Sequence, residues 1–314
     1  MVFFSESLQN KRSRNEDAYC HMDLQIDHEA TVSAFAVADG MGGLAAGNRY
    51  SRMAVSQWYE ELVRLLISGE FRGCSLKDQI EVLKDFSSEV FHRINLSLYK
   101  WGMDAGQKGG TTLTTAIFFW DTWIFACSGD SPAYVLKDGK LSLVTELQNL
   151  AWKMVREGKT RVGSTLFLQN KNRLIEFLGQ RQEIHPGMTV LEEDRADAVI
   201  LGSDGLFGDL RTDHMEEILQ APDRSRILTS LMEAAREGGE TDNQTGFLIY
   251  PSGRQNPALS EQESLFSGDG EEVLPIIMRS LPAEDPDRAS FRMVNEPEAG
   301  GFFRKLFGKK GDRT

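Results

Sequence analysis

Three apolar, strand-like runs in this chain each end in an aspartate, and this pattern constrains the fold more than any other feature. The runs end at Asp39, Asp130 and Asp204. A fourth aspartate, Asp242, stands just before the apolar run that ends at Tyr250. Glycine adjoins each of the first three aspartates, and glycine lets neighbouring backbones approach closely. Acidic side chains at several strand ends can therefore meet at one rim of a sheet.

Helix-like and strand-like patterns alternate up to about residue 251. Two long helices in succession are expected at Leu44–Ile67 and Leu76–Tyr99, where apolar residues recur at three- and four-residue spacing. Shorter helices are expected at Asn149–Glu157, Asp213–Leu219 and Arg224–Arg236. β-branched and apolar runs predict strands at Thr31–Ala38, Thr111–Trp120, Trp123–Ser128, Ala133–Lys137, Ala198–Leu201 and Gln244–Tyr250. The segment Lys137–Lys140 is typical of a hairpin turn.

The composition changes after Tyr250. Six of the nine prolines fall in the last 64 residues, among serine, glutamate and glycine. This predicts a folded domain over residues 1–251 and a flexible tail over 252–314. The final fifteen residues carry five basic residues against one acidic residue. Their stretch Phe302–Lys310 favours contact with an anionic membrane surface or a partner's groove, and a frayed tail is the alternative.

Charge and cysteine content exclude several other classes of protein. A net charge of -12 argues against unspecific binding to nucleic acid, which needs a basic face. The three cysteines follow no paired spacing, which suits a reducing compartment. The first residues lack the apolar core of a signal peptide, and no stretch approaches the ~20 apolar residues of a membrane span. A cytoplasmic location is expected.

Converging carboxylates imply bound cations. Several carboxylates a few ångströms apart repel one another and do not all ionise unless cations neutralise them. Ligand sets made only of oxygen select hard divalent ions, Mg²⁺ or Mn²⁺. The five histidines show no zinc-like pairing. The alternative for each aspartate alone is a helix or turn cap, since Asp-Gly is a common turn signal.

The order of short motifs resembles the metal-dependent (PPM, type 2C-like) protein serine/threonine phosphatases. The resemblance covers about residues 5 to 250 and excludes the tail. The motifs are Arg12-Ser-Arg-Asn15-Glu16-Asp17, Asp39-Gly40-Met41-Gly42-Gly43, Gly110-Thr111-Thr112, Gly129-Asp130-Ser131, Ser203-Asp204-Gly205-Leu206 and Asp242-Asn243. The resemblance implies an α+β fold, a four-layer α/β/β/α sandwich of two antiparallel sheets flanked by helix pairs.

The resemblance also implies a role for each matching residue. Asp39 would bridge two metal ions, Mn²⁺ or Mg²⁺, and Asp130 would serve a third ion found in the family. The other implied ligands are Glu16 and the carbonyl of Gly40, with Asp204 and Asp242 on the second ion. Asp17 and Asn243 would hold these ligands through hydrogen bonds. Arg12 would bind the phosphate, since its planar fork suits two phosphate oxygens.

The implied reaction is hydrolysis of phosphoserine and phosphothreonine by a metal-activated water, without a covalent intermediate. Two ions about 3.5–4 Å apart lower the pKa of a bridging water. The implied partners are phosphorylated proteins, with a serine/threonine kinase and its substrates, in signal transduction. The alternative is an inactive binding module of the same fold, although all four main acidic ligands are present.

Two positions depart from the family pattern. Met41 stands where some members carry histidine, so a histidine acid is not available there; methionine is common in bacterial-type members. Pro132 stands where an arginine usually follows Gly-Asp-Ser, which removes a donor beside the third-ion site. The segment Leu147–Arg173 corresponds to the family's variable flap, which is expected to influence substrate choice. Its apolar side chains either face a partner or pack inward, and inward packing is expected.

Two glycine-containing patterns suggest other functions. Gly40-Met41-Gly42-Gly43-Leu44-Ala45 fits a loose dinucleotide-binding pattern, which would indicate an oxidoreductase. Two consecutive helices follow it, however, where a βαβ unit needs a parallel strand. Gly158-Lys159-Thr160 matches the end of a phosphate-binding loop, but Lys153 occupies the place of its first glycine. Neither pattern displaces the phosphatase interpretation.

Overall fold

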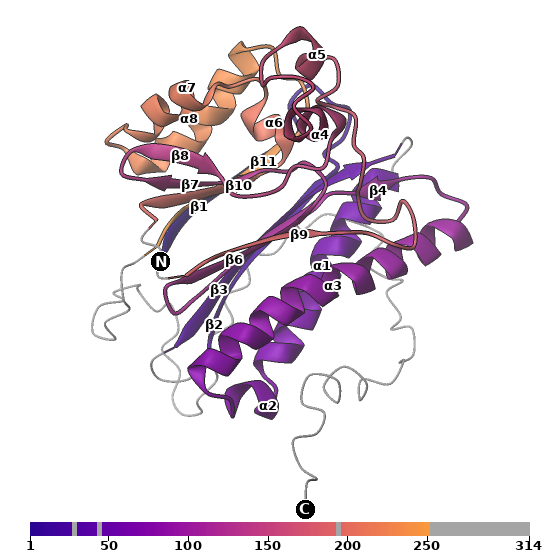
Figure 1. The fold of residues 1–314 in the computed structure, drawn as a ribbon, viewed down its shortest axis with the longest axis vertical. Coiled ribbons are helices and arrows are strands. Elements are labelled where there is room, and N and C mark those ends of the chain that lie inside the picture. The colour runs from indigo at the N-terminus through magenta and orange to yellow at the C-terminus, as the bar shows by residue number, and fades with distance from the viewer. Residues whose placement is uncertain (27–29, 43–45, 193–195, 252–314) are drawn as a thin grey trace, which may run out of the picture. The chain divides into compact units, whose positions relative to one another are not determined.

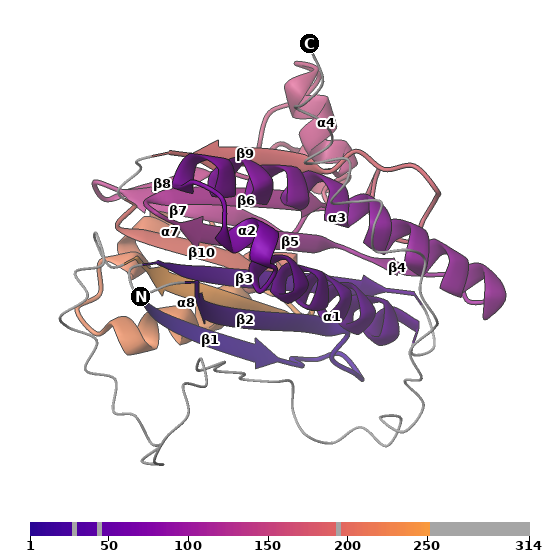
Figure 2. The ribbon, with the colours of Figure 1, turned by 90° about the horizontal axis from the view of Figure 1, so that it is seen from below.

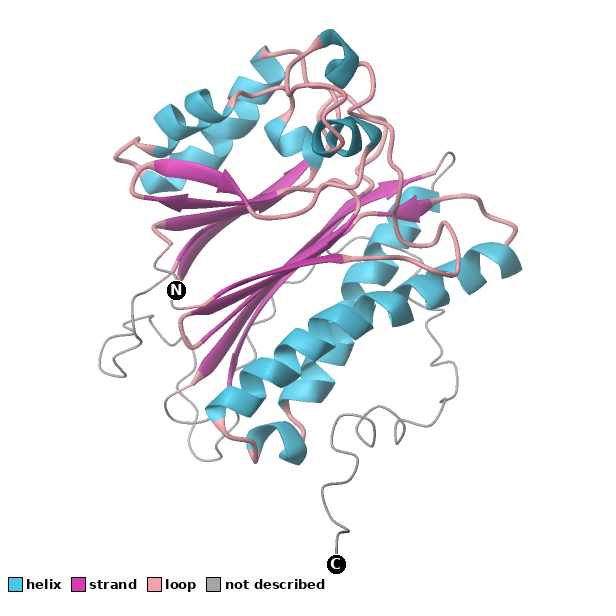
Figure 3. Ribbon diagram, in the orientation of Figure 1, coloured by secondary structure: helices cyan, strands magenta, loops and turns pink. Residues whose placement is uncertain are grey.

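A computed structural model describes residues 1–26, 30–42, 46–192 and 196–251. Two antiparallel sheets face each other, and helices cover the outer face of each sheet (Figure 1; Figure 3). The predicted four-layer α+β sandwich is therefore confirmed. The expected tail over 252–314 and its stretch Phe302–Lys310 lie outside the described residues, as does Gly43.

The first sheet is built from both ends of the domain. Its N-terminal strand β1 pairs with the C-terminal strand β11 from Val2↔Tyr250 to Leu8↔Gln244. The strands, in spatial order, are β1 (Val2–Leu8), β11 (Gln244–Tyr250), β10 (Ala198–Gly202), β7 (Ala133–Lys137) and β8 (Lys140–Leu143). This pairing places the segment after β1 beside the segment before β11.

The second sheet carries the long central strand β3. Its register with β2 sets Asp17 directly opposite Asp39. The strands, in spatial order, are β2 (Asp17–Gln25), β3 (Thr31–Met41), β5 (Leu113–Phe119), β6 (Thr122–Ser128) and β9 (Gly187–Leu191), with β4 (Gly110–Thr111) paired to the end of β3.

The core between the sheets follows the two-residue period of the strands. On β10, Val199 and Leu201 face the opposite sheet, whereas Ala198 and Ile200 face the helices. Aromatic rings from three strands meet in the middle layer, with the Phe35 and Phe247 ring centroids 5.2 Å apart. Strands β5 and β6 are buried along their whole length because both of their faces are covered.

Helices form the two outer layers. The long helices α1 (Ala46–Leu66) and α3 (Leu76–Asp104), joined through α2 (Gly69–Arg72), lie on the second sheet (Figure 2). On the first sheet lie α6 (Asp204–Phe207), α7 (Thr212–Leu219) and α8 (Arg224–Glu237). The flap, residues 147–173, contains α4 (Leu150–Arg156) and α5 (Thr165–Leu168). None of the described helices is long and apolar enough to cross a bilayer.

The structure adds elements that periodicity did not predict. Strands β1 and β2 are polar at several positions, and each is an edge strand of its sheet. Strand β9 is also an edge strand. The predicted hairpin is present: Lys137 pairs with Lys140, and Asp138 and Gly139 between them both have positive φ.

Candidate active site

The predicted acidic residues lie at the ends of strands from both sheets. Asp39 lies near the end of β3, and Asp130 follows β6. Asp204 begins α6, immediately after β10, while Asp242 precedes β11. Because antiparallel neighbours bring strand beginnings beside strand ends, segments far apart in sequence meet at one rim of the sandwich.

Asn243 holds the loop that carries Arg12 and Glu16. Its Oδ1 accepts a hydrogen bond from the Glu16 backbone N–H at 2.8 Å. Its Nδ2 donates to the carbonyls of Gln9 at 2.8 Å and Arg14 at 2.9 Å. Residues 10–14 of this loop form turns and bends. Asn243 therefore fixes the loop through its backbone.

A contact between two glycines lets helix α1 approach the end of β3. A Cβ atom at Gly40 would lie 2.2 Å from the Gly47 carbonyl oxygen and 2.6 Å from that of Glu16. A Cβ at Gly47 would lie 2.8 Å from the Gly40 carbonyl oxygen and 2.9 Å from the Glu16 carboxyl carbon. The Gly40 carbonyl and the Glu16 carboxylate therefore flank the same small space, beside Gly47.

Backbone hydrogen bonds fix the chain on both sides of this space. Ser51 in α1 donates from its Oγ to the Glu16 carbonyl at 2.6 Å, and the Gly40 N–H donates to the same carbonyl at 3.1 Å. The Asp39 N–H donates to the Oγ1 of Thr112 at 2.9 Å, and Thr111 donates from its Oγ1 to the Asp39 carbonyl at 2.9 Å. These hydrogen bonds fix the Asp39 backbone, and the fixed backbone in turn positions the Asp39 side chain.

Two carboxylate oxygens in the site are buried without a hydrogen-bond partner. They are the Oδ1 atoms of Asp17 and Asp204. The other Asp17 oxygen accepts from the Ser203 Oγ at 2.8 Å. Helix α6 approaches closely at Gly205, where a Cβ would lie 2.1 Å from the Asn243 carbonyl oxygen. Buried polar atoms are normally paired, so these two oxygens are available to a cation.

Asp130 is held by side chains from the segment that begins the flap. Asn149 donates from its Nδ2 to the Asp130 Oδ2 at 3.2 Å. Gln148 accepts from the Gly129 N–H at 2.9 Å, and its Nε2 donates to the His185 carbonyl at 2.7 Å. The Asp130 turn is therefore fixed through two consecutive residues, Gln148 and Asn149.

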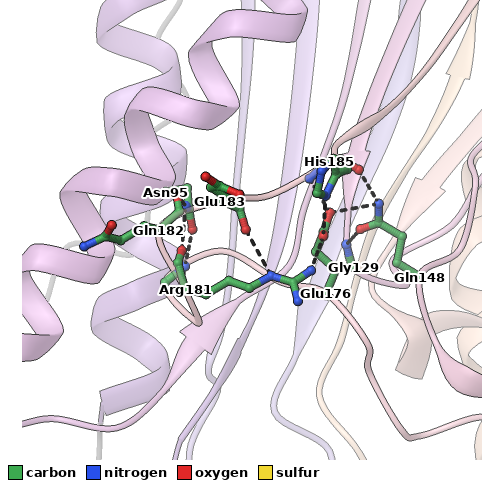
Figure 4. A network of polar contacts seen from close by, with 9 residues as sticks. Asn95, Gly129, Gln148, Glu176, Arg181, Gln182, Glu183 and His185 are labelled. Atoms are coloured by element: carbon green, nitrogen blue, oxygen red, sulfur yellow. Dashed lines mark hydrogen bonds and ion pairs between the residues drawn. The ribbon is translucent and has the colours of Figure 1, made fainter.

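Glu176 extends this support to helix α3 (Figure 4). Its buried carboxylate accepts from the His185 N–H at 2.6 Å and from the Arg181 Nη2 at 2.6 Å. The carbonyl of Arg181 in turn accepts from the Asn95 Nδ2 at 2.9 Å. One polar network thus connects α3, the segment after the flap and the turn that carries Asp130.

The acidic side chains are close enough to change one another's ionisation. Burial raises the pKa of the Asp39 carboxyl well above its ordinary value, and four other aspartates raise it further. These four are Asp17, Asp204, Asp242 and Asp130. Burial likewise raises the pKa of each of Asp17, Asp130 and Asp204, and a neighbouring aspartate adds to each shift. The structure places Asp130, Asp204 and Asp242 around one groove, next to these other aspartates.

Arg12 lies against the cluster and neutralises part of its charge. Its Nη2 donates to the Asp242 Oδ2 at 2.5 Å. This hydrogen bond is the largest of the effects that raise the Arg12 pKa, with Asp39 and Glu16 adding to it. Burial raises the pKa of Glu16, while the charge of Arg12 acts in the opposite direction. The Arg12 side chain is more than half exposed, so it remains accessible from the solvent side.

The donor set fits hard divalent cations. It consists of carboxylate oxygens and one backbone carbonyl, and two of the carboxylate oxygens are buried and unpaired. Within the described ranges, no three acidic, histidine or cysteine side chains already form a compact ligand group. One of the candidate ligands has another partner, because Asp242 pairs with Arg12.

Comparison with known families shows which family this chain belongs to. The model of the protein phosphatase 2C family matches residues 6–248. The chain belongs to this family. A serine/threonine phosphatase, stp, of Listeria monocytogenes is 32% identical over 221 residues, which cover 68% of this chain and 82% of that protein. The predicted family and serine/threonine phosphatase activity are confirmed, and the inactive-module alternative is not supported.

Solved structures share the fold of this phosphatase. The Streptococcus agalactiae serine/threonine phosphatase has a TM-score of 0.69 at 24% identity, over 80% of this chain and 100% of that chain. The catalytic domain of the serine/threonine protein phosphatase PstP, in complex with 2 manganese ions, has a TM-score of 0.60 at 25% identity. That match covers 79% of this chain and 96% of the PstP chain.

Several residues that support the site were not assigned a role from the sequence, although Thr112 and Ser203 belong to the family motifs. They support the predicted residues through backbone contacts or hydrogen bonds, and they are Gly47, Ser51, Thr112, Gln148 and Ser203. Gly47 has a sequence signal, since a glycine inside a helix needs a packing reason. Ser51 and Gln148 have no such signal, because serine and glutamine are common at the surface.

Proposed function

We propose that this phosphatase hydrolyses phosphoserine and phosphothreonine at the acidic cluster, with divalent cations bound among the aspartates at the strand ends of the two sheets. The observation that carries the proposal is the meeting of Asp130, Asp204 and Asp242 at one end of a groove, where the Asp204 Oδ1 is buried without a hydrogen-bond partner. Such a group is unfavourable without positive charge, and a single arginine beside it is not enough.

The proposed ligands form two groups around Asp39. Glu16 and the Gly40 carbonyl flank one space beside Gly47, which supports a first ion between them and Asp39. Asp204 and Asp242 lie together at the end of one groove, which supports a second ion. Asp130, close to Asp204, is the candidate for a third ion. The two manganese ions of the PstP catalytic domain support Mn²⁺ for this chain, and Mg²⁺ has the same ligand preference.

The remaining residues position the ligands and the phosphate. Divalent ions at such a site supply a nucleophilic water at neutral pH and neutralise phosphate charge. Arg12 donates its planar fork to phosphate oxygens, in place of its bond to Asp242. Asp17, held by Ser203, and Asn243, which fixes the loop of Glu16, keep the ligands in place. Met41 donates no proton, so no residue at that position protonates the leaving group.

The proposed substrates are phosphorylated proteins. The proposed signalling partner is a serine/threonine kinase with its substrates. We place the catalytic domain at residues 1–251, which contains the family match over 6–248, and the tail at 252–314. A cytoplasmic location suits both the substrate class and the acidic, cysteine-poor composition.

The test is release of phosphate from a phosphothreonine peptide, with Mn²⁺ or with a chelator. We expect turnover with Mn²⁺ and at least about 100-fold slower turnover with excess chelator, because the phosphate charge is then not neutralised. The full-length wild-type chain is used, and a peptide with unphosphorylated threonine gives the background. No turnover at saturating Mn²⁺ and Mg²⁺ would overturn the proposal.

A further inference from the structure

A groove of about 750 Å³ leads away from the acidic cluster. Asp130, Asp204 and Asp242 line the end at the active site. From there the groove runs between the flap on one side and the segment from α6 to α7 on the other, over strands β7 and β8. A volume in the range of ligand pockets has room for several side chains of a bound chain.

Apolar side chains line much of the groove beyond the aspartates, together with polar ones. Leu143 of β8 lines it, and Trp152, Val162 and Leu168 of the flap face it with Leu210 of the segment before α7. The two basic residues in the lining, Lys171 and Arg211, form ion pairs with Asp209 and Asp213. No unpaired cation therefore opposes an apolar occupant in this part of the groove, as far as the described residues show.

The flap leaves large apolar side chains in contact with solvent. Val162 is 60% exposed and Leu168 is 48% exposed, although both border the groove. Exposed apolar side chains that gather beside a cavity mark a binding surface. The flap also has its own packing, since Trp152 meets the buried Phe167 edge to face with ring centroids 5.7 Å apart. This contact within the flap therefore holds the Trp152 ring in place.

The flap is basic in an acidic protein. Residues 147–173 contain six basic residues and one acidic residue, a balance of +5, whereas the whole chain has a net charge of -12. The side chains of Lys153 and Lys159 are 50% and 64% exposed. Both lysines pair with Glu157, so the attraction of the flap for an anionic chain such as a phosphopeptide rests on its net positive charge.

We propose that this groove docks the part of the substrate next to the phosphorylated residue and takes a large apolar side chain. The substrate class is then a phosphoprotein segment with leucine, isoleucine, methionine or phenylalanine within about four residues of the phosphoserine or phosphothreonine. That spacing follows from an extended chain at roughly 3.3 Å per residue in a groove of this size. The inference rests on the proposed function. The groove is continuous with the acidic cluster, and a substrate that reacts at the cluster therefore extends into the groove.

Matched phosphothreonine peptides test the inference. One set carries leucine at a single position, up to four residues before or after the phosphothreonine, and the reference peptide carries alanine throughout. For the wild type we expect the best leucine peptide to exceed the reference about 10-fold in kcat/KM with Mn²⁺, because its side chain leaves water. The double variant Val162→Ser/Leu168→Ser should lose this preference.

The control variant is Leu166→Ser. Leu166 belongs to helix α5, as Leu168 does, and it is 42% exposed but does not line the groove. It should keep the wild-type preference, and all variants should hydrolyse a small aryl phosphate equally. Equal turnover of leucine and alanine peptides by the wild type, with aryl phosphate hydrolysis intact, overturns this inference alone. Loss of Mn²⁺-dependent aryl phosphate hydrolysis in the wild type overturns the proposed function and this inference with it.

A different occupant would give a different result. If a segment of this chain itself fills the groove, Val162→Ser/Leu168→Ser should raise turnover of every peptide by the same factor. That outcome also overturns the inference, since the wild type would then show no preference for leucine.

Discussion

Replacing Asp39 with asparagine should lower kcat for a phosphothreonine peptide by about 10³-fold or more at saturating Mn²⁺, equivalent to about 4 kcal/mol of lost transition-state stabilisation. The substitution keeps the shape of the side chain and removes the charge that the two proposed ion sites share. Because Asp39 lies among four like-charged side chains, the neutral amide also removes repulsion. The unfolding temperature of Asp39→Asn in chelator should therefore equal or exceed that of the wild type.

The matched control for this prediction is Asp85→Asn, since Asp85 is exposed on α3, far along the chain from the site segments. It should change neither turnover nor unfolding temperature measurably. Activity of Asp39→Asn within tenfold of the wild type would show that Asp39 does not hold the cations. A large fall in its unfolding temperature would instead make loss of activity a folding effect.

Replacing Gly40 with alanine should lower the free energy of unfolding by about 2–4 kcal/mol, although the change adds only a methyl group. The new Cβ would lie 2.2 Å from the Gly47 carbonyl oxygen and 2.6 Å from the Glu16 carbonyl oxygen. Both neighbours are backbone atoms, so no side chain can turn away to make room. Helix α1 or the Glu16 backbone must shift, and turnover should fall as well because both border the proposed ion site.

Chemical denaturation measures this effect, and Gly69→Ala is the control. A Cβ at Gly69 meets nothing within 4 Å, and the residue begins the short helix α2. Alanine there should leave the free energy of unfolding unchanged or raise it by up to about 1 kcal/mol. Equal stability of Gly40→Ala and Gly69→Ala would mean that α1 does not approach β3 as closely as described.

Long periodic segments could be predicted from the sequence because their burial is regular. Helices α1 and α3 and strands β7 and β11 lie where the apolar pattern placed them. Strand β1 could not be predicted, since a half-exposed edge strand carries little apolar signal and its pairing with β11 joins the two ends of the domain. Pairing over such a sequence distance leaves no local pattern.

The acidic residues of the site could be predicted because each follows or precedes an apolar strand and matches a family motif. Their supports could be predicted only in part, because the family resemblance implied a supporting role for Asp17 and Asn243 but nothing in the sequence indicated Gln148. Gln148 holds Gly129 by a side-chain bond across 19 positions of sequence, and Asn243 holds a loop more than 200 positions away. Such contacts depend on which loops meet at the rim of the sandwich, and that is decided by strand order.

The central claim is that the acidic cluster binds catalytic divalent cations, and titration of Mn²⁺ into the metal-free protein at neutral pH tests it most directly. Calorimetry of the wild type should detect about two ions per chain, with a third weaker ion if Asp130 also binds. In Asp39→Asn the affinity for the tighter ions should fall by at least about tenfold. A wild-type chain that binds no Mn²⁺ at millimolar concentration, or an Asp39→Asn chain that binds it as tightly as the wild type, would contradict the claim.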